Sequence, residues 1–249
     1  MTLMKTDGMV IREQTTGEQD RLVTVLTREK GVITAFVNGA RNPKNKNVSS
    51  TGLLCYSDFA IEKRKNNIYV IKESTAKEVF FSLREDITSL SLAQYFAEIA
   101  AELSPREEDS GEYLSLLLNS VYLLTNKKKN ERLIKAVTEL RLCALSGYMP
   151  DLVACHGCGE FECEDMYFSL DTGMLFCEKC KSSDRLVKLG AGIISAMRHI
   201  CFSSPEKVFS FNLPPDGILA LSDLTERYLK KVTMRNYKTL DFYKTMTDI

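Results

Sequence analysis

Apolar and polar positions alternate with the short period of β-strands from residue 8 to residue 74. Polar turns separate the apolar runs, and no helical periodicity interrupts them. The runs cover residues 9–11, 22–26, 32–37, 53–61 and 68–71. Five short strands without intervening helices are typical of a small barrel, so the pattern predicts a five-stranded OB-fold over residues 1–80. An SH3-like barrel is the alternative that the pattern leaves open.

From about residue 82 the apolar positions recur every three to four residues, which is the period of amphipathic helices. The first stripe ends at Ser104-Pro105, and the third ends at Gly147, with Pro150 beyond it. Two further stripes follow residue 186. We therefore predict an α+β chain: an N-terminal OB-fold barrel, then a mainly helical domain over 81–150 and 186–249, with a module inserted over 151–185.

That insert contains two Cys-x-x-Cys pairs separated by eighteen residues, which is the spacing of zinc ribbons. The four predicted ligands are Cys155, Cys158, Cys177 and Cys180. Cys163 and His156 lie close enough in sequence to replace one of them. Four thiolates leave no open coordination position, so we predict a structural zinc rather than a catalytic one. A disulfide framework is disfavoured because the eight cysteines are spread through 249 residues.

The composition is that of a globular protein, with 44% apolar residues to build a core. No signal segment and no apolar run of membrane-spanning length is seen, so we expect no membrane partner and a cytoplasmic location. The charge is zero overall but uneven. Residues 1–80 hold 13 basic and 9 acidic residues, net +4, whereas residues 151–185 hold 3 and 8, net −5. Any contact with a polyanion should therefore be local.

Catalytic groups are scarce. Neither histidine, His156 or His199, has an evident partner, and no phosphate-binding loop or His-Glu-x-x-His motif is present. The sequence therefore predicts no enzyme. A zinc hydrolase or deaminase is a second hypothesis, and it would require an open metal position.

Basic side chains gather in the turns and strands of the predicted barrel, where they suit contacts with phosphates. The predicted DNA-binding residues are Arg12, Arg21, Lys30, Arg41, Lys44, Lys46, Lys63, Arg64 and Lys65. Tyr56, Phe59 and Tyr69 are candidates for stacking on unpaired bases. Solvated loops are also rich in lysine, and barrel aromatics often point inward, so the charge pattern alone leaves DNA binding open.

Several motifs occur together in a characteristic order. They are Gly17-Glu18-Gln19-Asp20, Asn38-Gly39-Ala40-Arg41, Gly147-Tyr148-Met149-Pro150-Asp151-Leu152, Phe168-Ser169, and the two cysteine pairs. In this order and spacing they resemble the bacterial recombination mediator family RecO over nearly the whole chain.

The resemblance implies a DNA repair protein that binds single- and double-stranded DNA and anneals complementary strands. It also implies that the protein works with RecR, helps load RecA onto DNA coated by single-stranded-DNA-binding protein, has a functional link to RecF, and is nucleoid-associated. In the family, the acidic C-terminal tail of single-stranded-DNA-binding protein docks on the helical domain. The residues expected to receive it here are Arg227, Tyr228, Lys231 and Arg235. The alternative is a zinc-stabilised adaptor that binds protein partners with little direct DNA contact.

Overall fold

The computed structural model of the chain describes residues 2–17, 19–40, 42, 45, 47–64, 68–163, 165–182 and 186–247. Two compact units divide the chain. The first comprises Met1–Lys128 together with Tyr237–Ile249, and the second comprises Lys129–Asn236. The helices that follow the barrel are therefore shared between the two units.

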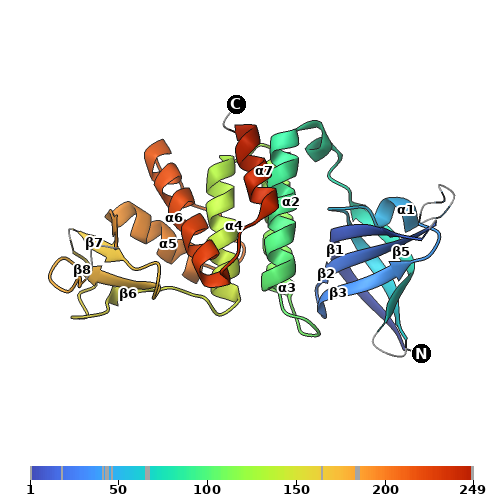
Figure 1. Ribbon diagram of the computed structural model, residues 1–249, viewed down its shortest axis with the longest axis horizontal. Helices are drawn as coiled ribbons and strands as arrows, with labels where there is room; N and C mark the ends of the chain where they lie inside the picture. The colour runs from blue at the N-terminus through green and yellow to red at the C-terminus, as the bar shows by residue number, and fades with distance from the viewer. Residues whose placement is uncertain are drawn as a thin grey trace. The chain divides into compact units, whose positions relative to one another are not determined.

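Five strands of the first unit close into a barrel (Figure 1). They are β1 (Thr2–Thr16), β2 (Asp20–Thr27), β3 (Gly31–Val37), β4 (Tyr56–Lys63) and β5 (Tyr69–Glu78). Their order is β1-β2-β3-β5-β4, and β4 pairs back onto β1. The neighbouring strands β3 and β5 run parallel, whereas the other pairs are antiparallel. This arrangement confirms the predicted five-stranded OB-fold.

Strand β1 is much longer than the short run predicted at residues 9–11 because it pairs with two neighbours in succession. Its first half pairs with β4 from Thr2 to Met9, and its second half pairs with β2 from Gly8 to Thr16. A register shift between Val10 and Arg12 lies where the strand passes from one partner to the other. The irregularity lets Val10 face the core while Arg12 is exposed, although the two residues are two positions apart.

The barrel interior is filled by side chains from all five strands. The buried cluster comprises Val10, Val23, Val25, Ile33, Ala35, Val37, Ala40, Phe59, Ile61, Tyr69 and Ile71. The short helix α1 (Asn47–Ser50) is fixed to β5 by the Asn47 side chain, whose Oδ1 accepts from the Ser74 backbone N–H at 2.9 Å. Alternate residues of each strand therefore build the core and leave the others outside.

Three longer helices complete the first unit: α2 (Ile87–Leu103), α3 (Gly111–Thr125) and α7 (Lys238–Thr247), with a 3₁₀ turn, η2 (Phe81–Glu85), before α2. Asp86 caps α2 by accepting hydrogen bonds from the backbone N–H groups of Thr88 and Ser89. Helix α7, which the sequence did not predict, packs against α2. Tyr237, just before α7, meets Tyr95 edge to face with 5.7 Å between ring centroids.

The second unit is built around α4 (Glu131–Leu145), which packs against α5 (Ala191–Phe202) and α6 (Pro215–Thr233) (Figure 1). Asn130 caps α4 through bonds to the backbone N–H groups of Arg132 and Leu133. Between α4 and α5 the chain forms a four-stranded sheet. Its strands are β6 (Asp151–Cys155), β7 (Met166–Phe168), β8 (Met174–Cys177) and β9 (Val187–Leu189), in the order β6-β8-β7-β9. The predicted insertion into a helical region is confirmed.

Candidate metal centre and nucleic-acid interface

The four predicted cysteine ligands meet at one end of the β6–β9 sheet. Strands β6 and β8 run parallel, and each ends on a cysteine, Cys155 and Cys177. Parallel strands end on the same side of a sheet, so the two Cys-x-x-Cys turns start next to each other. Both turns close in the same way, because the Gly159 and Lys181 N–H groups donate to the carbonyls of Cys155 and Cys177 at 2.8 and 3.0 Å.

The geometry of the four sulfurs fits a tetrahedral metal ion. Their Sγ atoms all lie within 4.8 Å of one another, and Cys158 Sγ lies 3.7 Å from Cys177 Sγ. Four thiolates around zinc would stand about 3.8 Å apart, given a Zn–S distance of about 2.3 Å. Among the described residues, Cys163 and His156 do not belong to this group. The His156 Nδ1 atom instead lies 4.0 Å from Asp151 Oδ2.

Backbone N–H groups stabilise the thiolate form of Cys155, which is the form that binds metals. Burial acts to raise the pKa of the Cys155 thiol, but N–H groups of Cys177, Cys158 and Gly157 stabilise its thiolate and bring the pKa down to about 6. The Cys177 N–H donates to this sulfur at 3.2 Å. The neighbouring thiols Cys177 and Cys158 hold the pKa of Cys180 at about 12. The cluster can thus hold a cation that displaces the remaining protons and neutralises the crowded sulfurs.

Gly157 is required because the two cysteine turns approach each other closely. A Cβ atom at this position would lie 2.8 Å from Cys180 Cβ and 2.9 Å from Cys180 Sγ. We expect Gly157→Ala to lower metal affinity by about 10–100-fold, as changes next to ligands do. Competition with a chromophoric chelator measures the affinity. Gly192→Ala, where an added Cβ meets nothing within 4 Å, is the control, and equal affinity of the two variants would refute the packing argument.

Two side chains attach the sheet to the helices of the second unit: Arg198, which the sequence did not single out, and Tyr228, which was predicted instead to bind a protein tail. Arg198 on α5 donates to the carbonyls of Leu152, Val153 and Phe161 at 2.7, 2.9 and 3.1 Å. Its guanidinium also lies 4.3 Å from the Phe161 ring centroid. Tyr228 on α6 donates to the Tyr148 carbonyl at 3.0 Å and packs its ring edge to face on Phe168. The cysteine cluster is therefore held on a rigid support.

The residues predicted to receive a protein tail lie on α6 or just beyond it. Tyr228 is 4% exposed, so its ring belongs to the interior of the second unit. Arg227 pairs with Asp223 at 3.2 Å, and Lys231 pairs with Asp171. Arg235 is exposed. The three cations are thus accessible, and Arg227 and Lys231 lie beside carboxylates.

The predicted DNA-binding cations of the barrel fall into three classes. Arg12 is exposed on β1, and Lys30 is exposed in the β2–β3 turn. Three others form ion pairs: Arg21 with Glu13 at 3.3 Å, Lys63 with Glu107 at 3.4 Å and Arg64 with Glu62 at 3.1 Å. The remaining four, Arg41, Lys44, Lys46 and Lys65, lie outside the described residues.

One outward face of the barrel combines a free cation with apolar side chains. The strand register places Arg12, Thr24 and Thr34 in one row across β1, β2 and β3, and places Gln14, Leu22 and Phe36 in the next row on the same face. Leu22 and Phe36 are only partly buried. No ion pair of Arg12 occurs in the part of the chain that the structure describes.

Phe36 was missed by the sequence reading, although a signal for it was present. Within β3, Thr34 is exposed between the buried residues Ile33 and Ala35. Phe36 lies two positions after Thr34, so its side chain points to the same outward face. The aromatic residues first considered for stacking lie elsewhere. Phe59 and Tyr69 belong to the barrel core, and the Tyr56 hydroxyl donates to Asp7 at 2.5 Å. The stacking prediction for Phe59 and Tyr69 is therefore wrong.

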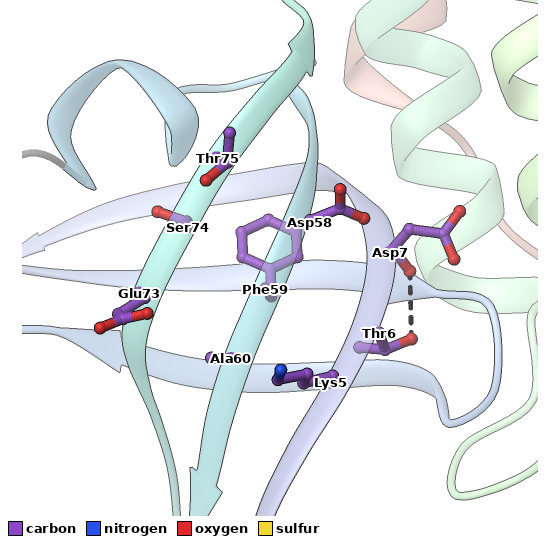
Figure 2. Close-up of a pocket in the computed structure, with 9 residues that line it drawn as sticks. All are labelled: Lys5, Thr6, Asp7, Asp58, Phe59, Ala60, Glu73, Ser74 and Thr75. Carbon is purple, nitrogen blue, oxygen red and sulfur yellow. Dashed lines mark hydrogen bonds between the residues drawn. The ribbon is translucent and has the colours of Figure 1, made fainter.

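The outward face formed by β1, β4 and β5 carries several carboxylates. An open depression of about 430 Å³ lies there, and its lining includes Asp7, Asp58, Glu73 and Lys5 (Figure 2). Burial disfavours the Asp7 carboxylate, but hydrogen bonds from Arg28 and Tyr56 outweigh it and lower the Asp7 pKa. Arg28 and Lys77 pair with Asp7 and Asp58 at 2.8 and 2.7 Å, so cations partly neutralise the carboxylates of this face.

Comparison with known proteins finds similarity to one protein family along nearly the whole chain. Family models described as Recombination protein O N terminal and Recombination protein O C terminal match residues 1–80 and 84–241. A DNA repair protein RecO from Acetivibrio thermocellus is 34% identical, with 100% of this chain and 99% of the relative covered. Proteins of the same name from Alkaliphilus metalliredigens and Caldicellulosiruptor bescii are each 27% identical, with 97% and 98% of this chain and 99% of each relative covered. Among the described residues, no helix is both long and apolar enough to cross a membrane.

Proposed function

The chain belongs to the Recombination protein O (RecO) family of DNA repair proteins, and from this membership we propose that it is a mediator of homologous recombination. In this proposal it binds single- and double-stranded DNA and anneals complementary strands. Together with RecR it helps load RecA onto DNA coated by single-stranded-DNA-binding protein. It acts in the cytoplasm at the nucleoid, and it catalyses no covalent reaction.

The observation that carries the proposal is the outward face of β1, β2 and β3. OB-folds bind oligonucleotides on the face of their second and third strands, where Leu22 and Phe36 lie here. Phe36 offers a ring on which an unpaired base can stack, and Arg12 stands within the same face to contact a phosphate. Stacking on one ring tolerates any base, so binding is expected to be independent of sequence.

Lys63, which ends β4, and Arg64, which follows it, lie outside this face. The Lys63–Glu107 pair is exposed on both sides, and such pairs contribute only about 0–1 kcal/mol, so a phosphate can replace Glu107 beside Lys63 at little cost. Annealing then needs no nucleotide hydrolysis. The protein has only to lower the repulsion between two strands and hold them close until base pairing begins.

The metal in the proposal is a structural zinc ion bound by the four clustered cysteines. Bound zinc would neutralise the thiolates and crosslink the ends of β6 and β8. The residues around it act only as supports: N–H groups stabilise the sulfurs, Gly157 permits the close approach, and Arg198 anchors the sheet. Four sulfur ligands leave no position for a reacting water, which supports the assignment as non-enzymatic.

We expect Phe36→Ala to weaken binding of a labelled oligothymidine by about 1–3 kcal/mol, the energy of stacking one base. Arg12→Ala should weaken it less and reduce the slope of log K against log salt by about 0.7, the contribution of one single-strand phosphate contact. Fluorescence anisotropy at several salt concentrations measures both. Lys5→Ala is the control, because Lys5 is an exposed cation of the same strand on the other outward face, and unchanged binding by Phe36→Ala would reject the β1–β2–β3 face.

A second candidate function is the protein adaptor with little direct DNA contact. It is favoured by one observation, the ion pairing of Arg21, Lys63 and Arg64. An adaptor would show no salt-dependent affinity for the oligothymidine by itself. It would change the anisotropy of the labelled oligothymidine only when a partner protein is added.

A further inference from the structure

The loop between α2 and α3 is fixed to the barrel at the β2–β3 turn and the start of β3. The Val32 N–H donates to the Pro105 carbonyl at 2.9 Å, and the Glu107 N–H donates to the Lys30 carbonyl at 3.0 Å. Gly31 lies between these bonds with a φ angle of 60°, and a Cβ atom on it would lie 2.0 Å from the Pro105 oxygen. The loop and the turn thus meet backbone against backbone, which sets the position of Glu107.

Glu107 holds an unfavourable backbone conformation and directs its carboxylate at two barrel residues. Its φ angle is 62°, in the left-handed region that residues with a side chain rarely adopt. Glu107 Oε1 accepts from the Tyr69 hydroxyl at 2.5 Å, and Oε2 lies 3.4 Å from Lys63 Nζ. The Tyr69 hydrogen bond, helped by the charges of Lys63 and Lys30, lowers the Glu107 pKa below its usual value. The carboxylate therefore stays ionised beside these cations near neutral pH.

The two barrel residues stand at the base of the loop between β4 and β5. Lys63 ends β4, Tyr69 begins β5, and the two residues are paired across the strands. OB-folds use this loop, together with the face of their second and third strands, to contact oligonucleotides. A lysine ammonium at this place suits a phosphate. Here Glu107, which comes from outside the barrel strands, already lies beside it.

A second carboxylate partners the other cations near the base of this loop. Arg64 and Lys72 share Glu62 Oε2, at 3.1 and 3.0 Å. The Glu62 side chain is 11% exposed, whereas the Glu107 side chain is 51% exposed. Glu107 is therefore the carboxylate that a strand arriving at Lys63 meets first.

We propose that Glu107 is a built-in competitor for a DNA phosphate at Lys63, and that it weakens DNA binding and hastens the release of a bound strand. The inference deepens the proposed DNA binding and rests on it. Lys63 can turn toward an arriving phosphate, but Glu107 stays in place, because Lys30 holds its backbone and Tyr69 holds its carboxylate. The carboxylate then repels the phosphate and recovers Lys63 when the strand leaves. A protein that anneals strands must also release them, which this competition favours.

Glu107→Gln keeps the size of the side chain and an acceptor for the Tyr69 hydroxyl but removes the charge. Binding of a labelled oligothymidine to the full chain should tighten by about twofold to fivefold at low salt, the range of one exposed ion pair. The slope of log K against log salt should steepen by about 0.7, which is one added phosphate contact. Dissociation into excess unlabelled oligothymidine, followed by stopped-flow anisotropy, should slow by a similar factor. Unchanged affinity, slope and rate would overturn the proposal.

Glu108→Gln is the matched control, because Glu108 is an exposed carboxylate of the same loop with no ion pair in the part of the chain that the structure describes. Equal tightening by both variants would show a general effect of charge and overturn the proposal. In a Lys63→Ala protein, Glu107→Gln should lose most of its effect, and an undiminished gain would also overturn it. Absence of oligothymidine binding by the wild-type chain would reject the proposed function as well, whereas wild-type binding without a gain in Glu107→Gln rejects this inference alone.

Discussion

Replacing Cys177 with serine is expected to abolish metal binding by the four-cysteine cluster and to unfold the β6–β9 sheet while helices α4, α5 and α6 persist. Cys177 is 5% exposed and ends the strand that lies beside β6. Structural zinc contributes about 10–16 kcal/mol of apparent folding free energy in small zinc-binding peptides. Even a partner of a metal ligand is worth about 10–100-fold in affinity, so loss of a ligand should exceed about a hundredfold.

Two measurements check this result. Metal content per chain should fall after dialysis, and backbone amides of residues 151–177 should exchange hydrogen faster, as followed by mass spectrometry. Cys163→Ser is the matched control, because this cysteine lies in the same loop but outside the group of four sulfurs. If Cys177→Ser kept its metal, or if Cys163→Ser lost it, the ligand assignment would be wrong.

The four-cysteine cluster could be predicted from the sequence because its geometry is local. Each Cys-x-x-Cys pair forms one turn, and the turn brings two sulfurs together whatever surrounds it. Only the meeting of the two turns depends on tertiary structure, namely on the parallel pairing of β6 and β8. The supports at Arg198 and Tyr228 could not be predicted, because their acceptors lie 46 and 80 residues away in sequence.

The barrel was predictable where alternation was strong and not where it was interrupted. The register shift between Val10 and Arg12 interrupts the alternation of inward and outward side chains in β1. Simple counting from Val10 would therefore place Arg12 in the core. Ion pairing is equally invisible in the sequence. Lys63 and Glu107 are 44 residues apart, and only the fold brings their charges to 3.4 Å.

Helix periodicity was reliable for apolar stripes but not for polar residues of a central helix. In α4 every residue from Leu133 to Ala144 is buried, including Lys135, Glu139 and Arg141. A helical stripe analysis assigns such charges to a solvated face, because it does not record what packs against that face. Arg141 instead donates to the carbonyls of Ile200 and Cys201 at 3.1 and 2.6 Å.

Lys135→Met is expected to lower the free energy of unfolding of the second unit by about 3–5 kcal/mol, which is the cost of breaking a buried ion pair from one side. Lys135 Nζ lies 2.9 Å from Glu139 Oε1 and 3.1 Å from Glu226 Oε2. The Lys135 and Glu139 side chains are 3% and 0% exposed. Without the ammonium group, Glu139 keeps a hydrogen bond from Thr225 at 2.7 Å but loses its ion pair with Lys135.

Guanidinium denaturation followed by hydrogen exchange in α4 and α6 measures the loss within this unit. Lys230→Met is the matched control, because Lys230 bonds the same Glu226 at 3.0 Å from a side chain that is 27% exposed, and it should cost about 0–1 kcal/mol. The double variant Lys135→Met with Glu139→Leu removes both buried charges and should recover most of the lost stability. A Lys135→Met protein as stable as Lys230→Met would show that the buried network contributes no more than a surface pair.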